Sequence, residues 1–324
     1  MFMRLGLGSL ACLAAAVSIA SAETWQMPTG YPPGNFHTQN IQAFADQVKA
    51  DTGGKLEIVV HPGGSLMPLP QIKRNVQSGD IRIGEVFLPG LENEAPVFGM
   101  DAVPFVVTGY DRAKQLWDAS RPLVEAQLKG QGIRVLYAVP WPPQGLYANR
   151  ELKSVADMRG LRFRSYGPSA ARFGELAGLS VSTIQAAELS EALATGRINA
   201  MLTSPVTGVD SRVWETSVKF YYDIQAFLPK NAVIVNEAAF AALDAPVRDA
   251  VLAAARAAET RGWAASQAAA QAATQTLAAN GVRVLEPSAE LKRDLARIGT
   301  QLVEDWGKRA GPEATAVLGR FRQE

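Results

Sequence analysis

The stretch "LRFRSYGPSAARFGELAGLSVSTI", residues 161–184, contains a strand, a helix and a second strand in immediate succession. The segment "LRFRS" alternates apolar with basic or polar residues, which is typical of a half-buried strand. Behind it, Pro168 stands in the first turn of a helical segment and Gly178 lies just beyond its end, where these residues are common. "SVSTI" indicates the second strand. This order predicts a βαβ unit of an open parallel sheet.

The same order continues in both directions from this unit. Downstream, "AELSEALATG" predicts a helix and "INAMLTS" a strand. Upstream, "ETWQM", "KLEIVV" and "IRIGEVFL" indicate strands, separated by a segment in which Ile41, Phe44 and Val48 recur at helical spacing and by the helical "PQIKRNVQSG". These two α/β units, joined by the extended "IRVLYAVPWPPQGLYANR", predict an α/β protein of two lobes with a cleft between them. A single continuous sheet is the alternative.

An alanine-rich segment extends from Ala245 to Gly281 and has no proline after Pro246. Alanine has the highest helix propensity, and at about 1.5 Å per residue such a helix spans roughly 50 Å. This length exceeds one lobe, so the helix, at about residues 246–280, is expected to extend across both. Gly262 is a candidate kink. A coiled-coil arm is the alternative, although the apolar residues keep no heptad repeat.

Residues 1–22 have the pattern of a cleavable signal peptide, with one basic residue, an apolar run and small residues before Glu23. An uncleaved membrane anchor is the alternative. Cys12 is the only cysteine and lies in this segment, so the exported chain is expected to fold without disulfide bonds. Lys and Arg number 32 and Asp and Glu 31, and removal of Arg4 makes the two counts equal. This balance argues against nucleic acid as a partner.

The residue patterns of common catalytic sites do not occur in the predicted mature sequence. His37 and His61 stand far apart in no spacing typical of metal ligands, so each is expected to be a surface or loop residue. No phosphate-binding glycine loop and no G-x-S-x-G motif is found. We therefore expect no catalytic or metal-ligating residue and no cofactor. An enzyme acting on carboxylates is the alternative, with Glu85 as the candidate for its base.

Polar residues stand where two of the predicted strands end. Arg164 and Ser165 close "LRFRS", and Thr203 and Ser204 close "INAMLTS". Open parallel sheets bind ligands beyond the carboxyl ends of their strands, so these four side chains are expected at one edge, facing the cleft. Arg164 is nearer the turn than Arg162, and its planar guanidinium matches a carboxylate in two parallel hydrogen bonds. The sequence therefore predicts that Arg164 holds an anion.

Aromatic residues lie near the predicted cleft. Trp141 and Tyr147 belong to the segment that joins the two units, and Tyr31 follows the first strand. Such residues can form the apolar side of a pocket. They favour a monocarboxylate with an apolar or aromatic body, such as a 2-oxo acid, a 2-hydroxy acid or an aromatic acid. Trp214, in "SRVWETSVKFYYD", is expected in the core of a helix.

The mature chain, over essentially its whole length, resembles the periplasmic solute receptors of tripartite ATP-independent periplasmic (TRAP) transporters. The likeness rests on "FADQVKADTGGKLEIVVHPGGSL", "DAVPFVV", "LYANRELKSVADMRGLRFRSY" and "ELSEALATGRINAMLTSP", in this order. The resemblance implies a periplasmic protein whose lobes close on a small organic acid and which delivers it to a membrane permease. It also sets the limits of the lobes: residues 23–140 with 233–270, and residues 141–232 with 271–324.

The resemblance bears on individual residues as well. The carboxylate-binding arginine of the family follows a "D-x-[KR]-G-[LM]" turn, which is "DMRGL" here and selects Arg164. Gln144 stands where sialic-acid-binding members have a second arginine, and Ser204 where they have an asparagine before a proline. These departures argue against sialic acid. Glu85 falls where members often contact the ligand, and a solvated strand end is the alternative for it. A receptor of an ATP-driven transporter or of a sensor is the alternative role.

Overall fold

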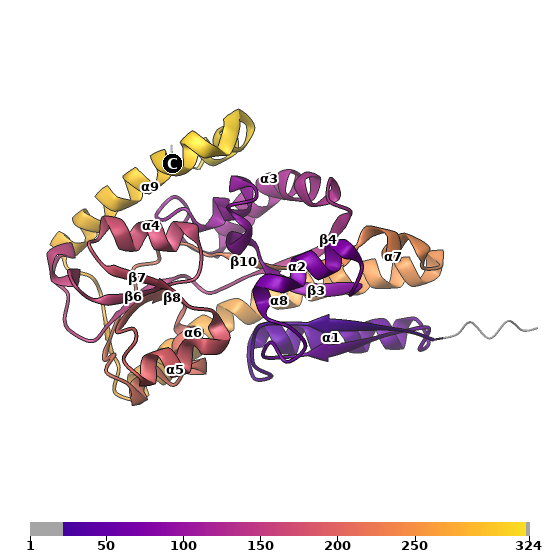
Figure 1. The fold of residues 1–324 in the computed structure, drawn as a ribbon, viewed down its shortest axis with the longest axis horizontal. Helices are drawn as coiled ribbons and strands as arrows, with labels where there is room; N and C mark the ends of the chain where they lie inside the picture. The colour runs from indigo at the N-terminus through magenta and orange to yellow at the C-terminus, as the bar shows by residue number, and fades with distance from the viewer. Residues whose placement is uncertain (1–21, 322–324) are drawn as a thin grey trace, which may run out of the picture.

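The computed structural model describes residues 22–321, so the predicted signal peptide lies outside the described residues except for Ala22. Two lobes lie side by side along the long axis of the molecule (Figure 1). In chain order the strands are β1 (Glu23–Pro28), β2 (Leu56–His61), β3 (Ile83–Phe87), β4 (Ile133–Pro140), β5 (Gly145–Ala148), β6 (Arg162–Ser165), β7 (Ser180–Thr183), β8 (Ala200–Thr203), β9 (Phe220–Tyr222), β10 (Lys230–Asn236) and β11 (Arg283–Leu285). The α-helices are α1 (Phe36–Asp51), α2 (Leu69–Ser78), α3 (Tyr110–Lys129), α4 (Pro168–Leu176), α5 (Leu189–Ala194), α6 (Pro205–Asp210), α7 (Glu237–Ala242), α8 (Ala245–Ala279) and α9 (Ala289–Gly319). Short 3₁₀ helices are η1 (Leu88–Leu91), η2 (Pro96–Ala102), η3 (Val155–Met158), η4 (Ala186–Glu188) and η5 (Val213–Glu215).

The second lobe is built on a six-stranded sheet with the strand order β11-β9-β5-β8-β6-β7. β6 pairs in parallel with both β7 and β8, as the strand–helix–strand pattern predicts. In this register Arg164 of β6 lies opposite Ser182 of β7 and Met201 of β8. The carboxyl ends of these three strands therefore meet at one edge of the sheet.

The first lobe differs from the predicted parallel sheet. β1 and β2 pair in parallel, but β3 pairs with β10 in antiparallel fashion, and β10 pairs likewise with β4. β10 enters this lobe only after the chain has passed through the second lobe. A strand from a distant part of the sequence thus takes the place beside β3, and the pattern of the N-terminal segment alone gives no sign of it.

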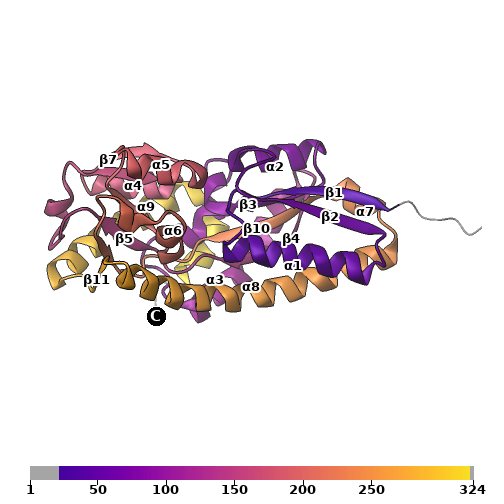
Figure 2. The same cartoon turned by 90° about the horizontal axis from the view of Figure 1, so that it is seen from below.

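α8 is a continuous helix that extends beneath both lobes (Figure 2). It packs against α1 and β4 of the first lobe and against α6 and β11 of the second, which excludes a free coiled-coil arm. Gly262 is not a break in the helix. A Cβ atom at this position would lie 2.3 Å from Cγ2 of Val139 and 2.8 Å from Nδ2 of Asn40. The glycine therefore allows α8 to approach β4 and α1 closely.

We expect Gly262→Ala to destabilise the protein, although alanine is the better helix former by about 1 kcal/mol. The added methyl group would overlap Val139 and Asn40, and overpacking of this kind costs about 1–3 kcal/mol. The matched control is Gly307→Ala in α9, where a Cβ atom meets no atom within 4 Å and helix propensity acts alone. Denaturant unfolding measures both variants. Stabilisation by Gly262→Ala would contradict the close packing.

α9 packs on both lobes and bends at Gly311, where φ is 75°. Its first half places Ile298 in the core of the second lobe, whereas its second half places Trp306 in the core of the first. The resemblance predicts that all of residues 271–324 belong to the second lobe. The second half of α9 instead contributes to the core of the first lobe from Val303 and Trp306 onward, and these two residues precede the kink.

Candidate functional site

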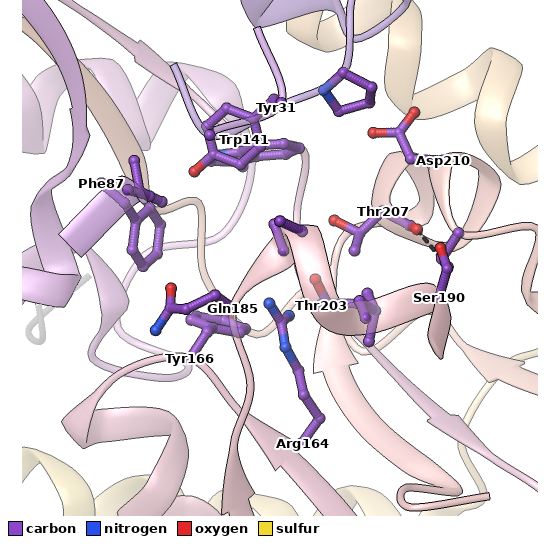
Figure 3. A pocket seen from close by; sticks show the side chains of 18 of the residues that line it. Tyr31, Phe87, Trp141, Arg164, Tyr166, Gln185, Ser190, Thr203, Thr207 and Asp210 are labelled. Atoms are coloured by element: carbon purple, nitrogen blue, oxygen red, sulfur yellow. Dashed lines mark hydrogen bonds between the residues drawn. The ribbon is translucent and has the colours of Figure 1, made fainter. Parts of the chain in front are cut away.

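A cavity of about 300 Å³ lies between the lobes, at the carboxyl ends of β6 and β8 (Figure 3). Its volume is at the lower end of the range for small-molecule sites, so it suits a ligand of few atoms. Both lobes line it, together with the two crossing segments, residues 141–144 and 223–229. Its lining includes Tyr31 and Phe87 of the first lobe, Trp141 and Gln144 of a crossing segment, and Arg164, Tyr166, Gln185, Thr203, Thr207 and Asp210 of the second lobe.

Arg164 is the basic side chain among the described residues that line this cavity. It is 4% exposed, and its Nε donates a hydrogen bond to the carbonyl of Ile184 at 2.9 Å. Its guanidinium carbon lies 4.7 Å from the centroid of the Tyr166 ring. Burial lowers the pKa of Arg164 to about 10, and the group stays protonated at neutral pH. No carboxylate within residues 22–321 forms an ion pair with it. The cavity therefore contains a buried cation without an anionic partner.

Two of the four strand-end residues selected from the sequence, Arg164 and Thr203, line the cavity. Ser165 is fully buried, and its hydroxyl donates to a carbonyl of the following turn at 3.2 Å. Ser204 is the N-cap residue of α6, where its Oγ accepts from the backbone N–H of Thr207 at 3.2 Å. Both serines hold backbone in place beside the cavity and are not among its lining residues.

Tyr31 and Trp141 form the wall of the cavity opposite Arg164 (Figure 3). Each is 6% exposed, and their rings pack edge to face with centroids 4.9 Å apart. Gln144 also lines the cavity, but both ends of its amide have partners. Its Nε2 donates to a neighbouring backbone carbonyl at 2.7 Å, and its Oε1 accepts from the hydroxyl of Tyr166 at 3.0 Å. The structure thus places these three predicted contacts in the cavity wall.

Glu85 lies behind this wall and is not a lining residue. It is 2% exposed and accepts hydrogen bonds from the hydroxyl of Thr29 and, at 2.8 Å, from Nδ2 of Asn231. Asn231 accepts in turn, through Oδ1, from Nε1 of Trp141 at 3.0 Å and from the hydroxyl of Tyr31 at 3.3 Å. Glu85 is therefore not a solvated strand end, because β10 pairs beside it, and it lies behind the lining residues and not among them.

The protonation of Glu85 links the stability of the protein to pH. Burial raises the pKa of Glu85 from 4.5 to about 7, although its two hydrogen bonds favour the carboxylate. The native state thus holds this proton more tightly than the unfolded chain, so the stability contribution is full below about pH 4.5 and is lost as the pH rises to about 7. We expect the free energy of unfolding to fall by about 2.5 kcal/mol more in the wild type than in Glu85→Gln between about pH 5 and about pH 8. Denaturant unfolding at both pH values tests this, and equal falls would contradict it.

Other lining residues are not among those predicted from the sequence, and they include Phe87, Tyr166, Gln185, Thr207 and Asp210. Phe87 ends β3, and Tyr166 and Gln185 come just after β6 and β7. The rule that selects Arg164, a polar or aromatic residue where a strand ends, could have found these three. Thr207 lies on α6, and its position depends on how the lobes pack, which the local sequence does not indicate.

Three expectations outside the cavity lining differ from the structure to different degrees. His37 is not a surface residue: it is 2% exposed in the first turn of α1, and its ring centroid lies 4.5 Å from that of Trp141. Burial lowers the pKa of His37, so the imidazole is neutral. His61 is half-buried at the end of β2. Trp214 is half-buried in η5 and packs against a core cluster of the second lobe, and it is not in an α-helix.

Two kinds of feature are missing from the part of the chain that the structure describes. No three His, Cys, Asp or Glu side chains within residues 22–321 come together as ligands for a metal ion. Over the same range, no helix combines the length and the apolar character needed to cross a membrane.

Comparison with known proteins gives one family and several relatives. Residues 29–309 match the family described as bacterial extracellular solute-binding protein, family 7 (DctP). A curated solute-binding protein of Albidiferax ferrireducens is 24% identical over 221 residues, which is 65% of this chain and 65% of that protein. The match thus spans less than two thirds of that relative.

Two solved structures are similar over nearly the whole chain. DctP6 of Bordetella pertussis, an extracytoplasmic solute receptor binding pyroglutamic acid, is 43% identical with a TM-score of 0.91, and the match covers 93% of this chain and 100% of that one. A TRAP solute-binding protein from a marine metagenome, specific for pyroglutamate and solved with co-purified pyroglutamate, is 40% identical with a TM-score of 0.91. That match covers 94% of this chain and 99% of that one.

Proposed function

The chain belongs to family 7 of the bacterial extracellular solute-binding proteins, and from this premise we propose that it captures a small organic acid and delivers it to the permease of a TRAP transporter in the membrane. The observation that carries the proposal is the buried, unpaired guanidinium of Arg164 in a cavity between two lobes. A buried charge without a partner is costly. A bound carboxylate removes this cost through two parallel hydrogen bonds.

We infer that pyroglutamate, or a ring acid of similar size, is the ligand. Two relatives of 43% and 40% identity bind pyroglutamate, and the cavity of about 300 Å³ suits so small a molecule. The wall of Tyr31 and Trp141 offers an apolar surface to the ring, and Arg164 offers the cation to the carboxylate. Micromolar affinity corresponds to about −8 kcal/mol, which an enclosed ring and one bidentate ion pair can supply. A 2-oxo acid, a 2-hydroxy acid or an aromatic acid is the alternative ligand.

We propose hinge closure as the mechanism, because the cavity needs both lobes. The proposed lobes are residues 23–140 with 233–270 and residues 141–232 with the chain from 271 to Leu302 of α9. A hydrogen bond from Nδ2 of Asn35 to Oδ2 of Asp210, at 2.7 Å, joins the lobes at the rim of the cavity. A ligand that contacts both lobes stabilises the closed state through contacts that the open state lacks.

The proposed ligand predicts a stability change. At one hundred times its Kd, pyroglutamate is expected to raise the free energy of unfolding by about 2.7 kcal/mol. The protein is first unfolded and refolded to remove any acid that copurifies, and that acid is identified by mass spectrometry. Calorimetry then gives the Kd. Failure of the refolded protein to bind pyroglutamate or any of the alternative monocarboxylates would contradict the proposed function.

Closure predicts a change of shape. Saturating ligand should compact the wild type in small-angle scattering and slow amide exchange in the crossing segments. Tyr31→Ala should weaken binding, because it removes a contact that the first lobe makes with the ligand and leaves Arg164 in place. Unchanged dimensions, together with full affinity in Tyr31→Ala, would mean that the second lobe binds alone.

Two other roles remain distinguishable by experiment. A receptor for an ATP-driven transporter or a sensor would bind the same acid but a different membrane partner, so co-purification with a TRAP permease separates these roles. An enzyme would convert the bound acid. Glu85, the base considered from the sequence, is separated from the cavity by the aromatic wall, and mass spectrometry of the acid after incubation tests for turnover.

A further inference from the structure

The amide of Asn231 has partners that fix its orientation. Nε1 of Trp141 can only donate, and it lies 3.0 Å from Oδ1 of Asn231. On the other side, Oε1 of Glu85 lies 2.8 Å from Nδ2. An ionised Glu85 can only accept, and if it is protonated on the oxygen that faces Thr29, Oε1 still accepts. The carbonyl oxygen of Asn231 therefore points toward the cavity wall and its NH₂ group toward Glu85.

This orientation determines where the hydroxyl hydrogen of Tyr31 points. Oη of Tyr31 lies 3.3 Å from Oδ1 of Asn231, and because a carbonyl oxygen cannot donate, the hydroxyl donates to it. Burial raises the pKa of Tyr31, and the charge of Arg164 offsets part of this rise, as expected of groups that share one cavity. With its hydrogen used behind the wall, where the indole N–H of Trp141 also interacts with it, the tyrosine oxygen keeps a lone pair for a ligand.

The hydroxyl of Tyr166 likewise donates its hydrogen to a protein group. The carbonyl of Pro142 can only accept and lies 2.7 Å from Nε2 of Gln144, so the amide oxygen of Gln144 faces Tyr166. The hydroxyl of Tyr166 donates to that oxygen at 3.0 Å. The hydroxyls of both cavity tyrosines thus donate to protein groups and are left as acceptors, whereas Arg164 supplies donors to the carboxylate.

We propose that Asn231, oriented by Glu85, sets Tyr31 as a hydrogen-bond acceptor, so that the receptor selects carboxylates that also carry an N–H or O–H donor. The inference rests on the proposed function, in which the carboxylate itself binds Arg164. Asn231 and Glu85 act as positioning residues, since neither lines the cavity. Pyroglutamate carries such a donor in its ring N–H. An acid of the same shape with a ring oxygen there would bring its lone pairs against those of Tyr31.

The test compares pyroglutamate with 5-oxotetrahydrofuran-2-carboxylate, the lactone in which oxygen replaces the ring N–H. We expect the wild type to bind the lactone about 10- to 100-fold more weakly in calorimetry. Tyr31→Phe keeps the ring and removes the acceptor, so it should weaken pyroglutamate alone and bring the two affinities within about threefold. Asn231→Leu frees the hydroxyl of Tyr31 to donate to the lactone, so it should also reduce the ratio of the Kd for the lactone to the Kd for pyroglutamate.

Glu85→Gln is the conservative control. Its amide oxygen can still accept from Asn231 and its NH₂ group can donate to Thr29, so the wild-type ratio should be retained. Equal affinity of the wild type for both acids overturns the proposal. An unchanged ratio of the two Kd values in Tyr31→Phe also overturns it. If circular dichroism shows that Asn231→Leu is unfolded, the result for Tyr31→Phe alone decides. If pyroglutamate does not bind, the proposed ligand is wrong, and the acid that copurifies tests whether Tyr31 acts as a hydrogen-bond acceptor. A copurifying acid with no N–H or O–H donor beyond its carboxyl group overturns that proposal.

Discussion

Replacement of Arg164 by alanine is expected to remove most of the affinity for the acid. The carboxylate would leave water for a cavity that no longer offers a cation, and loss of one partner of such a pair costs about 2–5 kcal/mol, or roughly 30- to 5,000-fold in Kd. The stability of the ligand-free protein should respond differently. Because Arg164 is 4% exposed and has no acidic partner among the described residues, its removal should leave the free energy of unfolding unchanged or higher.

Two further variants make this test specific. Arg164→Lys should also bind poorly, since an ammonium group cannot form the two parallel hydrogen bonds of a guanidinium. Arg162→Ala is the matched control: Arg162 is exposed on the same strand, and its Nε donates to the carbonyl of Gly196 at 2.8 Å, away from the cavity lining. It should keep wild-type affinity in calorimetry. Wild-type affinity in Arg164→Ala would show that another group holds the acid.

The parallel strands β6, β7 and β8 of the second lobe could be predicted because they are local, whereas the antiparallel pairing of β5 with β8 and β9, and the addition of β11, were not predicted. β6, α4 and β7 follow one another in the chain and are neighbours in space, and each has its own periodicity and end signals. α8 could be predicted for the same reason, since alanine-rich sequence indicates a helix without reference to anything else. The sheet of the first lobe could not, because β10 joins it from beyond the second lobe.

The residues of the site also differ in whether local sequence was enough to predict their positions. Arg164 and Thr203 could be placed at the cavity because both stand at the ends of adjacent parallel strands. Glu85 also stands near a strand end, but its surroundings depend on β10. Because β10 pairs beside β3, Glu85 is buried and accepts a hydrogen bond from Asn231. Asn231 lies within β10 itself and has no distinguishing signal in the sequence. Its proposed role follows only from the three groups around its amide, those of Tyr31, Trp141 and Glu85.

Lys230→Met is expected to cause the largest loss of stability. Lys230 is the first residue of β10, and its Nζ donates to Oδ2 of Asp101 in η2 at 2.9 Å, with side chains that are 1% and 10% exposed. The substitution leaves the carboxylate buried without its cation, which costs about 3–5 kcal/mol. Burial already raises the pKa of Asp101 in the presence of Lys230. The loss, measured by denaturant unfolding, should therefore shrink at acid pH, where Asp101 becomes neutral.

The double variant Lys230→Met with Asp101→Leu separates the pair from its parts. Well-packed apolar residues often replace a buried ion pair at little cost, so the double variant should recover most of the stability. The double variant also tests whether the ion pair supports ligand binding, since Lys230 directly precedes Asn231 in β10. If the ion pair positions β10, the double variant will be stable but will bind pyroglutamate more weakly than the wild type. A double variant as unstable as Lys230→Met alone would instead assign the loss to another contact of Lys230, such as the Trp117 ring, whose centroid lies 5.7 Å from Nζ.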